Sequence, residues 1–190
     1  MKSVCVYLGA NLGNSARLRE AATTLGQVIA TAGYRLVYGG SSQGLMGLLA
    51  TSAMAHGGKV TGVIPTCLID KELPSDNLDS LILTESMHER KLIMQQQADA
   101  FIVMPGGLGT LEEAFETWTA IKIGILNKPL GFLNIDGFYD ELFSFIGNCT
   151  QHGFIAPHQM HIPSIDSNPQ TLLASLEKHY TAVAPEAVCA

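Results

Sequence analysis

The chain has 190 residues, of which 47% are hydrophobic and 15% are charged, and its formal net charge is −6 at pH 7. This composition is typical of one globular domain with a sizeable core, and it excludes an intrinsically disordered chain. The acidic balance disfavours nucleic acids and anionic membranes as partners, because no overall positive charge would attract them.

No apolar run approaches the ~20 residues that a transmembrane helix needs. The N-terminal MKSVCVYLGANLG passes directly into a strand-like run, without the longer apolar stretch and cleavage site of a signal peptide. The four cysteines are scattered without a CxxC pair, which favours free thiols in a reducing compartment over a disulfide framework or a zinc site. We therefore expect a cytoplasmic protein without a membrane segment.

Short β-type runs alternate with longer helical patterns along the chain. Because the β-type runs are almost continuously apolar and are separated by helices, the pattern predicts a doubly wound α/β fold. We expect a Rossmann-like, mainly parallel sheet with helices on both faces, in a single domain over 1–182 with a frayed tail at 183–190. In chain order the expected elements are strand 3–9, helix 15–32, strand 35–40, helix 44–58, strand 59–65, a polar connection at 66–79, strand 80–85, helix 87–98, strand 100–105, helix 110–126, strand 129–135, helix 138–152, a weak strand 161–165 and helix 169–181.

Three glycine-bearing loops follow predicted strands: YLGANLG (7–13), YGGSSQGLMG (38–47) and MPGGLGT (104–110). In a sheet of this kind ligands bind outside the carboxyl ends of the strands, near the switch in strand order. The three loops therefore predict a rim where backbone N–H groups meet an anion. The sequence has no GxxxxGK[ST], no dinucleotide-type GxGxxG with a following acid, and no GxSxG elbow, so the common nucleotide and hydrolase motifs do not describe it.

Two short motifs have both a structural and a functional interpretation. Thr110-x-x-Glu113 is either a capping box that closes a helix start, or part of a phosphate seat with a carboxylate beside it. Ser86-x-x-Glu89 predicts a second cap, which places Arg90 and Lys91 in the opening turns of a helix. Cations there oppose the helix dipole. Either solvent and neighbouring acids balance them, or an anionic ligand lies between the two helix starts.

The pairing of MHERK (87–91) with PGGLGTLEE (105–113) resembles the Lonely Guy family, the cytokinin-activating nucleoside 5′-monophosphate phosphoribohydrolases. The family pattern PGGxGTxxE is matched at every fixed position, YGGSSQGLMG resembles its second glycine loop, and the resemblance covers nearly the whole chain. Two positions depart from it: Ala10 stands where relatives often have serine, and Ser41 replaces a common glycine. No convincing setting for a pyridoxal-phosphate lysine is present, so the older lysine decarboxylase label of this family is rejected.

The resemblance implies hydrolysis of the N-glycosidic bond of AMP or a cytokinin nucleoside 5′-monophosphate, without a cofactor or metal, to give free base and ribose 5-phosphate. Glu113 is then the carboxylate that steadies an oxocarbenium-like sugar and orients water, and Arg90 assists the departing base, since it is too basic to donate a proton. The resemblance also implies a homodimer whose active site borders the partner. Implied substrate-binding residues are Glu72, Lys91, Gly106, Gly107, Leu108, Gly109, Thr110, Leu111, Glu112 and Thr119, with Gly40, Met46 and Gly47 at the border of the nucleotide.

Several residues have plainer interpretations. We expect Glu116 to be solvent-facing or paired, and Phe115 and Trp118 to pack or to lie at a subunit contact. The histidines of HGFIAPHQMH (152–161) lack a regular spacing, which disfavours a metal site. The alternative function is a carrier or sensor that holds an AMP-like ligand without cleaving it. The sequence leaves open whether AMP or a prenylated nucleotide is the physiological substrate.

Overall fold

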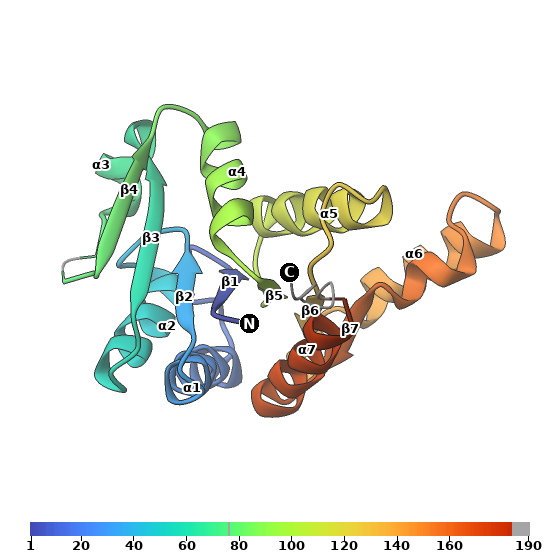
Figure 1. Ribbon diagram of the computed structural model, residues 1–190, viewed down its shortest axis with the longest axis horizontal. Helices are drawn as coiled ribbons and strands as arrows, with labels where there is room; N and C mark the ends of the chain where they lie inside the picture. The colour runs from blue at the N-terminus through green and yellow to red at the C-terminus, as the bar shows by residue number, and fades with distance from the viewer. Residues whose placement is uncertain (76, 184–190) are drawn as a thin grey trace, which may run out of the picture.

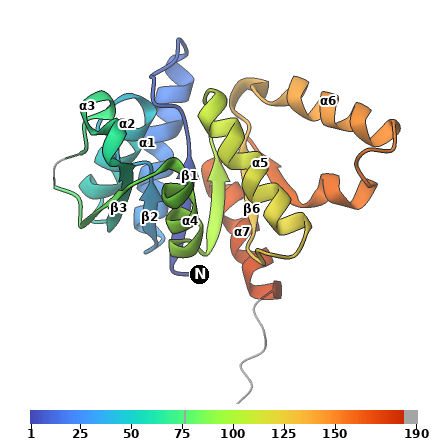
Figure 2. The ribbon, with the colours of Figure 1, turned by 90° about the horizontal axis from the view of Figure 1, so that it is seen from above.

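The structure, a computed structural model, describes residues 1–75 and 77–183 and forms three layers, with a central sheet between two layers of helices (Figures 1 and 2). The elements are β1 (Ser3–Tyr7), α1 (Ala16–Thr31), β2 (Arg35–Tyr38), α2 (Gly44–Ala55), β3 (Val60–Pro65), the 3-10 helix η1 (Thr66–Leu68), α3 (Ile69–Glu72), β4 (Ser80–Thr84), α4 (Met87–Gln97), β5 (Ala100–Val103), α5 (Leu108–Lys122), β6 (Leu130–Leu133), η2 (Ile135–Gly137), α6 (Asp140–Gln151), η3 (Pro157–His161), β7 (Pro163–Asp166) and α7 (Pro169–Val183).

The strand order is β4-β3-β2-β1-β5-β6-β7, and every neighbouring pair is parallel. The chain first builds the sheet outward from β1 to β4 and then returns to place β5 on the other side of β1. Cys5 of β1 consequently has Val37 of β2 on one side and Phe101 of β5 on the other. The switch in strand order therefore lies between β1 and β5, and the predicted Rossmann-like fold is confirmed.

The core is divided by the sheet into two halves. Val4 and Val6 of β1 face α1, α2 and α7, whereas Cys5 and Tyr7 face α4, α5 and α6. Both faces of the central strands are thus buried, which explains why their sequences are continuously apolar instead of alternating. Each fully buried aliphatic side chain contributes about 1.5–3 kcal/mol to folding, so the two half-cores hold the strand ends in fixed register.

The Ser86 cap predicted from the sequence is present. The hydroxyl of Ser86 accepts a hydrogen bond from the Glu89 backbone N–H at 3.1 Å, as the motif requires. The Glu89 carboxylate accepts from the N–H of Glu85 at 2.7 Å, one residue earlier than a complete capping box would have it. Arg90 and Lys91 therefore do lie near the start of α4.

The structural interpretation of Thr110-x-x-Glu113 is wrong. Helix α5 begins at Leu108 with Gly107 as its N-cap, two residues before the predicted start. Thr110 is therefore already inside the first turn and Glu113 lies in the second, where no free N–H remains for a box to close. The capping role, which was the plain explanation of Glu113, no longer applies.

The remaining differences lie in connections. The predicted polar connection 66–79 contains η1 and α3, and a further 3-10 helix, η3, precedes β7. The expected tail lies outside the described residues except for Val183, which ends α7. Within the described part of the chain, no helix has the length and apolarity to cross a membrane, and Cys5, Cys67 and Cys149 are free thiols.

Candidate active site

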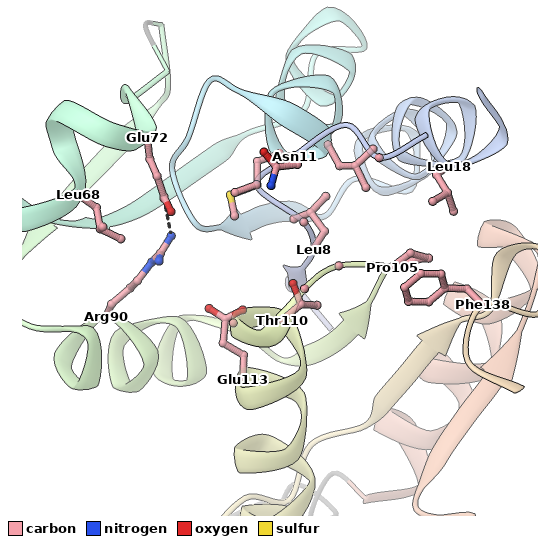
Figure 3. Close-up of a pocket in the computed structure, with 18 of the residues that line it drawn as sticks. Leu8, Asn11, Leu18, Leu68, Glu72, Arg90, Pro105, Thr110, Glu113 and Phe138 are labelled. Atoms are coloured by element: carbon pink, nitrogen blue, oxygen red, sulfur yellow. Dashed lines mark ion pairs between the residues drawn. The ribbon is translucent and has the colours of Figure 1, made fainter. Parts of the chain in front are cut away.

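A cavity of about 410 Å³ opens at the carboxyl edge of the sheet, above the switch between β1 and β5 (Figure 3). The loop after β1 and the loop after β5 form its floor, and the first turns of α4 and α5 form one wall. The second glycine loop contributes through Leu45 and Met46 at the start of α2, and α3 contributes Glu72. Ligands are expected at this position in a doubly wound sheet, so the glycine-bearing strand ends do meet at one site.

The start of α5 forms a bare surface of backbone in this cavity. A Cβ placed on Gly106 would lie 2.2 Å from Thr110 Oγ1 and 2.8 Å from the backbone N of Gly9, so packing alone requires that glycine. A Cβ on Gly107 or Gly109 would meet nothing within 4 Å, although both residues line the cavity. The protein's own packing does not require these two glycines, whereas an anion approaching the N–H groups of the helix start would.

The substitution Gly109→Ala tests whether this glycine is needed for packing or for the approach of an anion. Alanine at this helical position is expected to preserve or slightly raise thermal stability, because it lowers the entropy of the unfolded chain. Affinity for AMP is expected to fall at least about tenfold, since the methyl group occupies the approach to the helix N–H groups. Calorimetric titration with AMP and a thermal melt measure the two effects. An unchanged affinity would contradict binding of the phosphate at this helix start.

Arg90 is almost fully buried and is held by backbone oxygens at two strand ends. Its Nε donates to the carbonyl of Val63 at 2.9 Å, and its Nη2 donates to the carbonyl of Gly39 at 2.7 Å. A Cβ on Gly39 would lie 2.3 Å from this Nη2, so the guanidinium occupies space that only a glycine leaves open. Among the described residues, the hydrogen-bond partner of its Nη1 is the thioether of Met87, a weak acceptor at 3.8 Å. One donor edge of the guanidinium is therefore available to a ligand.

Glu113 projects from the second turn of α5 toward the same cavity (Figure 3). Burial raises the pKa of its carboxyl from 4.5 to about 7. The positive charge of Arg90 opposes this rise, and the negative charges of Glu112 and Glu72 add to it. A carboxyl group poised near neutral pH inside a cavity is typical of a catalytic base.

Glu72 completes the charged group from the opposite wall. Its Oε2 lies 3.5 Å from Arg90 Nη2, and Figure 3 shows this pair bridging α3 and α4. Arg90 thus has a carboxylate from α3 beside it and a second carboxylate, that of Glu113, on the neighbouring wall.

The structure brings together eight of the residues that the resemblance implied. These residues line the cavity: Met46, Glu72, Arg90, Gly106, Gly107, Gly109, Thr110 and Glu113.

Other implied residues lie outside the cavity lining. Lys91 is paired with Glu112 and, at 2.9 Å, with Glu116, so Glu116 is paired as expected. Leu108, the first residue of α5, is 87% exposed. Gly47 packs against the backbone of Ser42, since a Cβ there would lie 2.0 Å from its carbonyl oxygen. Gly40, Leu111 and Thr119 also lie outside the lining, and Thr119 borders a small groove between α5 and α6.

Eleven of the lining residues are not among the site residues that the resemblance implied. Asn11 belongs to the first glycine loop, so its place at a strand end was a usable signal. Leu68, Met87 and Phe138 are apolar residues at element boundaries, which carry no local signal for a site. Ser41, one of the two departures from the family pattern, is fully buried and absent from the lining; its hydroxyl donates to the carbonyl of Glu72 at 2.6 Å.

The fold and the cavity define a doubly wound α/β protein with a cavity at the switch in strand order, lined by the start of α5, by the buried Glu113 carboxyl and by the Arg90 guanidinium. Residues 46–176 match a family described as "Possible lysine decarboxylase". A cytokinin riboside 5′-monophosphate phosphoribohydrolase of Arabidopsis thaliana is 43% identical over 94% of this chain and 78% of its own length. A second from the same plant is 42% identical over 94% of this chain and 82% of its own length. The chain belongs to the Lonely Guy family of phosphoribohydrolases.

Solved structures extend the likeness of fold. The molybdenum cofactor binding protein of the phototrophic bacterium Rippkaea orientalis is 25% identical, with a TM-score of 0.68 over 94% of this chain and 97% of that one. The molybdenum cofactor carrier protein of Chlamydomonas reinhardtii is 23% identical with a TM-score of 0.69, over 95% of this chain and 99% of that one. None of the described cavity-lining residues is a lysine.

Proposed function

We propose that this protein hydrolyses the N-glycosidic bond of purine nucleoside 5′-monophosphates, including AMP and cytokinin nucleotides, to free base and ribose 5-phosphate. The observation that carries the proposal is the buried Glu113 carboxyl, which shares a cavity with Arg90 and with the bare N-terminus of α5. The names of relatives about 40% identical support the same reaction.

In the proposed reaction, the ionised Glu113 carboxylate accepts a proton from a water molecule that attacks the anomeric carbon of the ribose. The bond from that carbon to the base nitrogen breaks, and its electron pair leaves with the base, which then takes a proton from solvent. The ring oxygen carries positive charge in the transition state, which the carboxylate stabilises. The Arg90 edge that carries Nη1 donates hydrogen bonds to the departing base and offsets its negative charge.

The phosphate of the substrate anchors this arrangement at the helix start. Backbone N–H groups of Gly107 to Thr110, with the Thr110 hydroxyl, are the proposed donors. Each hydrogen bond to a charged group contributes about 1.5–3 kcal/mol. Binding energy from this remote group can orient the ribose against Glu113, so it is expected to raise turnover as well as affinity.

Substrate comparison tests the proposal directly. AMP and isopentenyladenosine 5′-monophosphate are expected to be cleaved with a kcat/KM at least about 100-fold above that of adenosine, because two or more charged hydrogen bonds are lost with the phosphate. Chromatographic separation of base from nucleotide measures the products. Equal efficiency with adenosine would contradict the phosphate seat, and no free base from either nucleotide would contradict the reaction.

A carrier or sensor is the second candidate, and the shared fold of the two molybdenum cofactor proteins is the observation that favours it. A carrier would bind AMP measurably and return it uncleaved in the same experiment. A buried acid with a pKa near neutrality has no evident use in a passive carrier, which is why hydrolysis is preferred.

We also propose that the protein is a cytoplasmic homodimer. An apolar surface on α5, α6 and the loops that follow them supports the dimer, and Figures 1 and 2 show α6 extending away from the sheet. In this dimer Thr119 faces the substrate of the neighbouring subunit. The large apolar side chains exposed on this surface are Phe115, Ile123, Ile125, Phe145 and Phe154.

Phe145→Glu is expected to convert the dimer into a monomer, because a carboxylate buried in an apolar contact lacks a partner. Sedimentation velocity at micromolar concentration measures the change. Leu83→Glu is the matched control, since Leu83 is similarly exposed but lies on the edge strand β4, at the other end of the sheet. A monomeric wild-type protein would contradict the proposed homodimer.

A further inference from the structure

Ser41 joins the second glycine loop to the segment that carries Glu72. It is fully buried, and its hydroxyl donates to the carbonyl of Glu72 at 2.6 Å while accepting from the backbone N–H of Gln43 at 3.1 Å. A hydroxyl that is buried with both a donor and an acceptor in place has one orientation. It therefore fixes the end of α3 relative to the loop after β2.

The segment after α3 is attached to the same loop by further bonds. The backbone N–H and the hydroxyl of Ser42 both donate to the carbonyl of Leu73, each at 2.9 Å. The N–H of Ser75 donates to the carbonyl of Gly40 at 3.0 Å. Leu73 itself has a φ of 33°, a conformation that L-residues rarely adopt and that these bonds must maintain.

The Ser41 bond acts at the residue whose side chain matters to the site. Helix α3 has only four residues, so it cannot hold Glu72 in place by its own stability. The carboxylate of Glu72 nevertheless meets Arg90 Nη2 at 3.5 Å, and the guanidinium is already fixed by the carbonyls of Val63 and Gly39. The position of Glu72 is thus the adjustable part of the pair.

We propose that Ser41 is a positioning residue, whose hydroxyl holds Glu72 against Arg90. The carboxylate of Glu72 in turn sets how strongly the positive charge of Arg90 acts on Glu113. The proposal deepens the proposed function, on which its kinetic meaning rests. Ser41 does not contact the substrate; it acts through the backbone of Glu72. A glycine at this position would leave the carbonyl of Glu72 without this donor and the pair less firmly held.

Ser41→Ala tests the proposal, with Ser52→Ala as a matched control. Ser52 is also buried, and its hydroxyl also donates to a backbone carbonyl, that of Thr23 at 2.7 Å, but it joins α2 to α1 away from the cavity. Hydrogen–deuterium exchange of residues 66–75 is expected to accelerate in Ser41→Ala and to remain at the wild-type rate in Ser52→Ala. Ser41→Thr, which keeps the hydroxyl, is expected to restore protection.

The titration of Glu113 is the second readout, measured by carbon-13 NMR of the unliganded protein. The groups that act on its carboxyl are Arg90 and Lys91 on α4, Glu112 on α5, and Glu72. When Glu72 moves away, a repelling charge is lost and the charge of Arg90 becomes less screened. Both changes lower the pKa of Glu113, so its midpoint is expected to fall in Ser41→Ala and to stay in place in Ser52→Ala.

Affinity for AMP supplies a third comparison: a loss of about fivefold is expected in Ser41→Ala, because Glu72 and Arg90 of the cavity lining lose their fixed arrangement, and no loss is expected in Ser52→Ala. Equal exchange in the two alanine variants would overturn the proposal. Faster exchange without a change in the Glu113 midpoint would also overturn it, because the hydroxyl would then only stabilise the segment. Exchange and titration require no hydrolysis, so failure of the proposed reaction would be seen separately, as intact nucleotide with the wild type.

Discussion

Glu113→Gln is expected to lower kcat for AMP about 10³-fold while the protein stays folded. Glutamine keeps the size of the side chain but supplies neither the negative charge nor the base that the proposed reaction needs. Glu116→Gln is the control, because Glu116 lies on the same helix but pairs with Lys91 outside the cavity. Product release assays on both variants give the comparison. Turnover within tenfold of the wild type for Glu113→Gln would exclude the catalytic role.

The same substitution is expected to stabilise the protein at alkaline pH. The folded protein keeps a proton on Glu113 up to about pH 7, whereas the unfolded chain loses it near 4.5. The contribution of this proton to folding is therefore complete below pH 4.5 and is lost as the pH rises through 7. The interval between the two values corresponds to about 3 kcal/mol. Glutamine stays neutral, so its advantage over wild type is expected in melts at pH 8 and absent at pH 4.

Arg90→Ala is expected to abolish turnover and also to destabilise the fold, by about 3–5 kcal/mol. The carbonyls of Val63 and Gly39 would lose their donor, and the carboxylate of Glu72 would remain without its cation. Denaturant unfolding and product assays measure the two effects.

Arg90→Lys keeps the charge and separates it from the geometry. A single ammonium cannot reproduce the planar fork that contacts both carbonyls, so most of the activity is expected to be lost with a smaller loss of stability. Arg17→Ala is the control, since Arg17 pairs with Asp136 on the exposed surface. If Arg90→Ala unfolded no more readily than Arg17→Ala, the buried contacts would be unimportant.

The fold was predictable because its signals are local. Apolar strands such as that around Val4 and glycines that end helices mark the elements, and the alternation of elements fixes a parallel sheet. The start of a helix was predicted less accurately where glycines overlap with the helical pattern. At Gly107 the chain enters the helix earlier than Thr110 suggested, because a bare N-cap leaves no side-chain signature.

The site was predictable only in part. Arg90 and Glu113 belong to motifs, and the switch in strand order brings their strand ends together. The partners of Arg90 are backbone carbonyls of β3 and of the loop after β2, which no side-chain pattern indicates. The role of Ser41 was likewise hidden, because its partner is the carbonyl of a residue 31 positions away.

The hydrogen bonds from Arg90 to main-chain carbonyls restrict which substitutions the protein can tolerate at the two residues that carry these carbonyls. A different side chain at position 63 would keep the hydrogen bond to Arg90, since every amino acid has the same backbone carbonyl. Position 39 has no such freedom, because even one added methyl would collide with the guanidinium. Natural variants should therefore tolerate other apolar residues at the buried position 63 but no residue with a Cβ at position 39, although both positions make the same kind of bond.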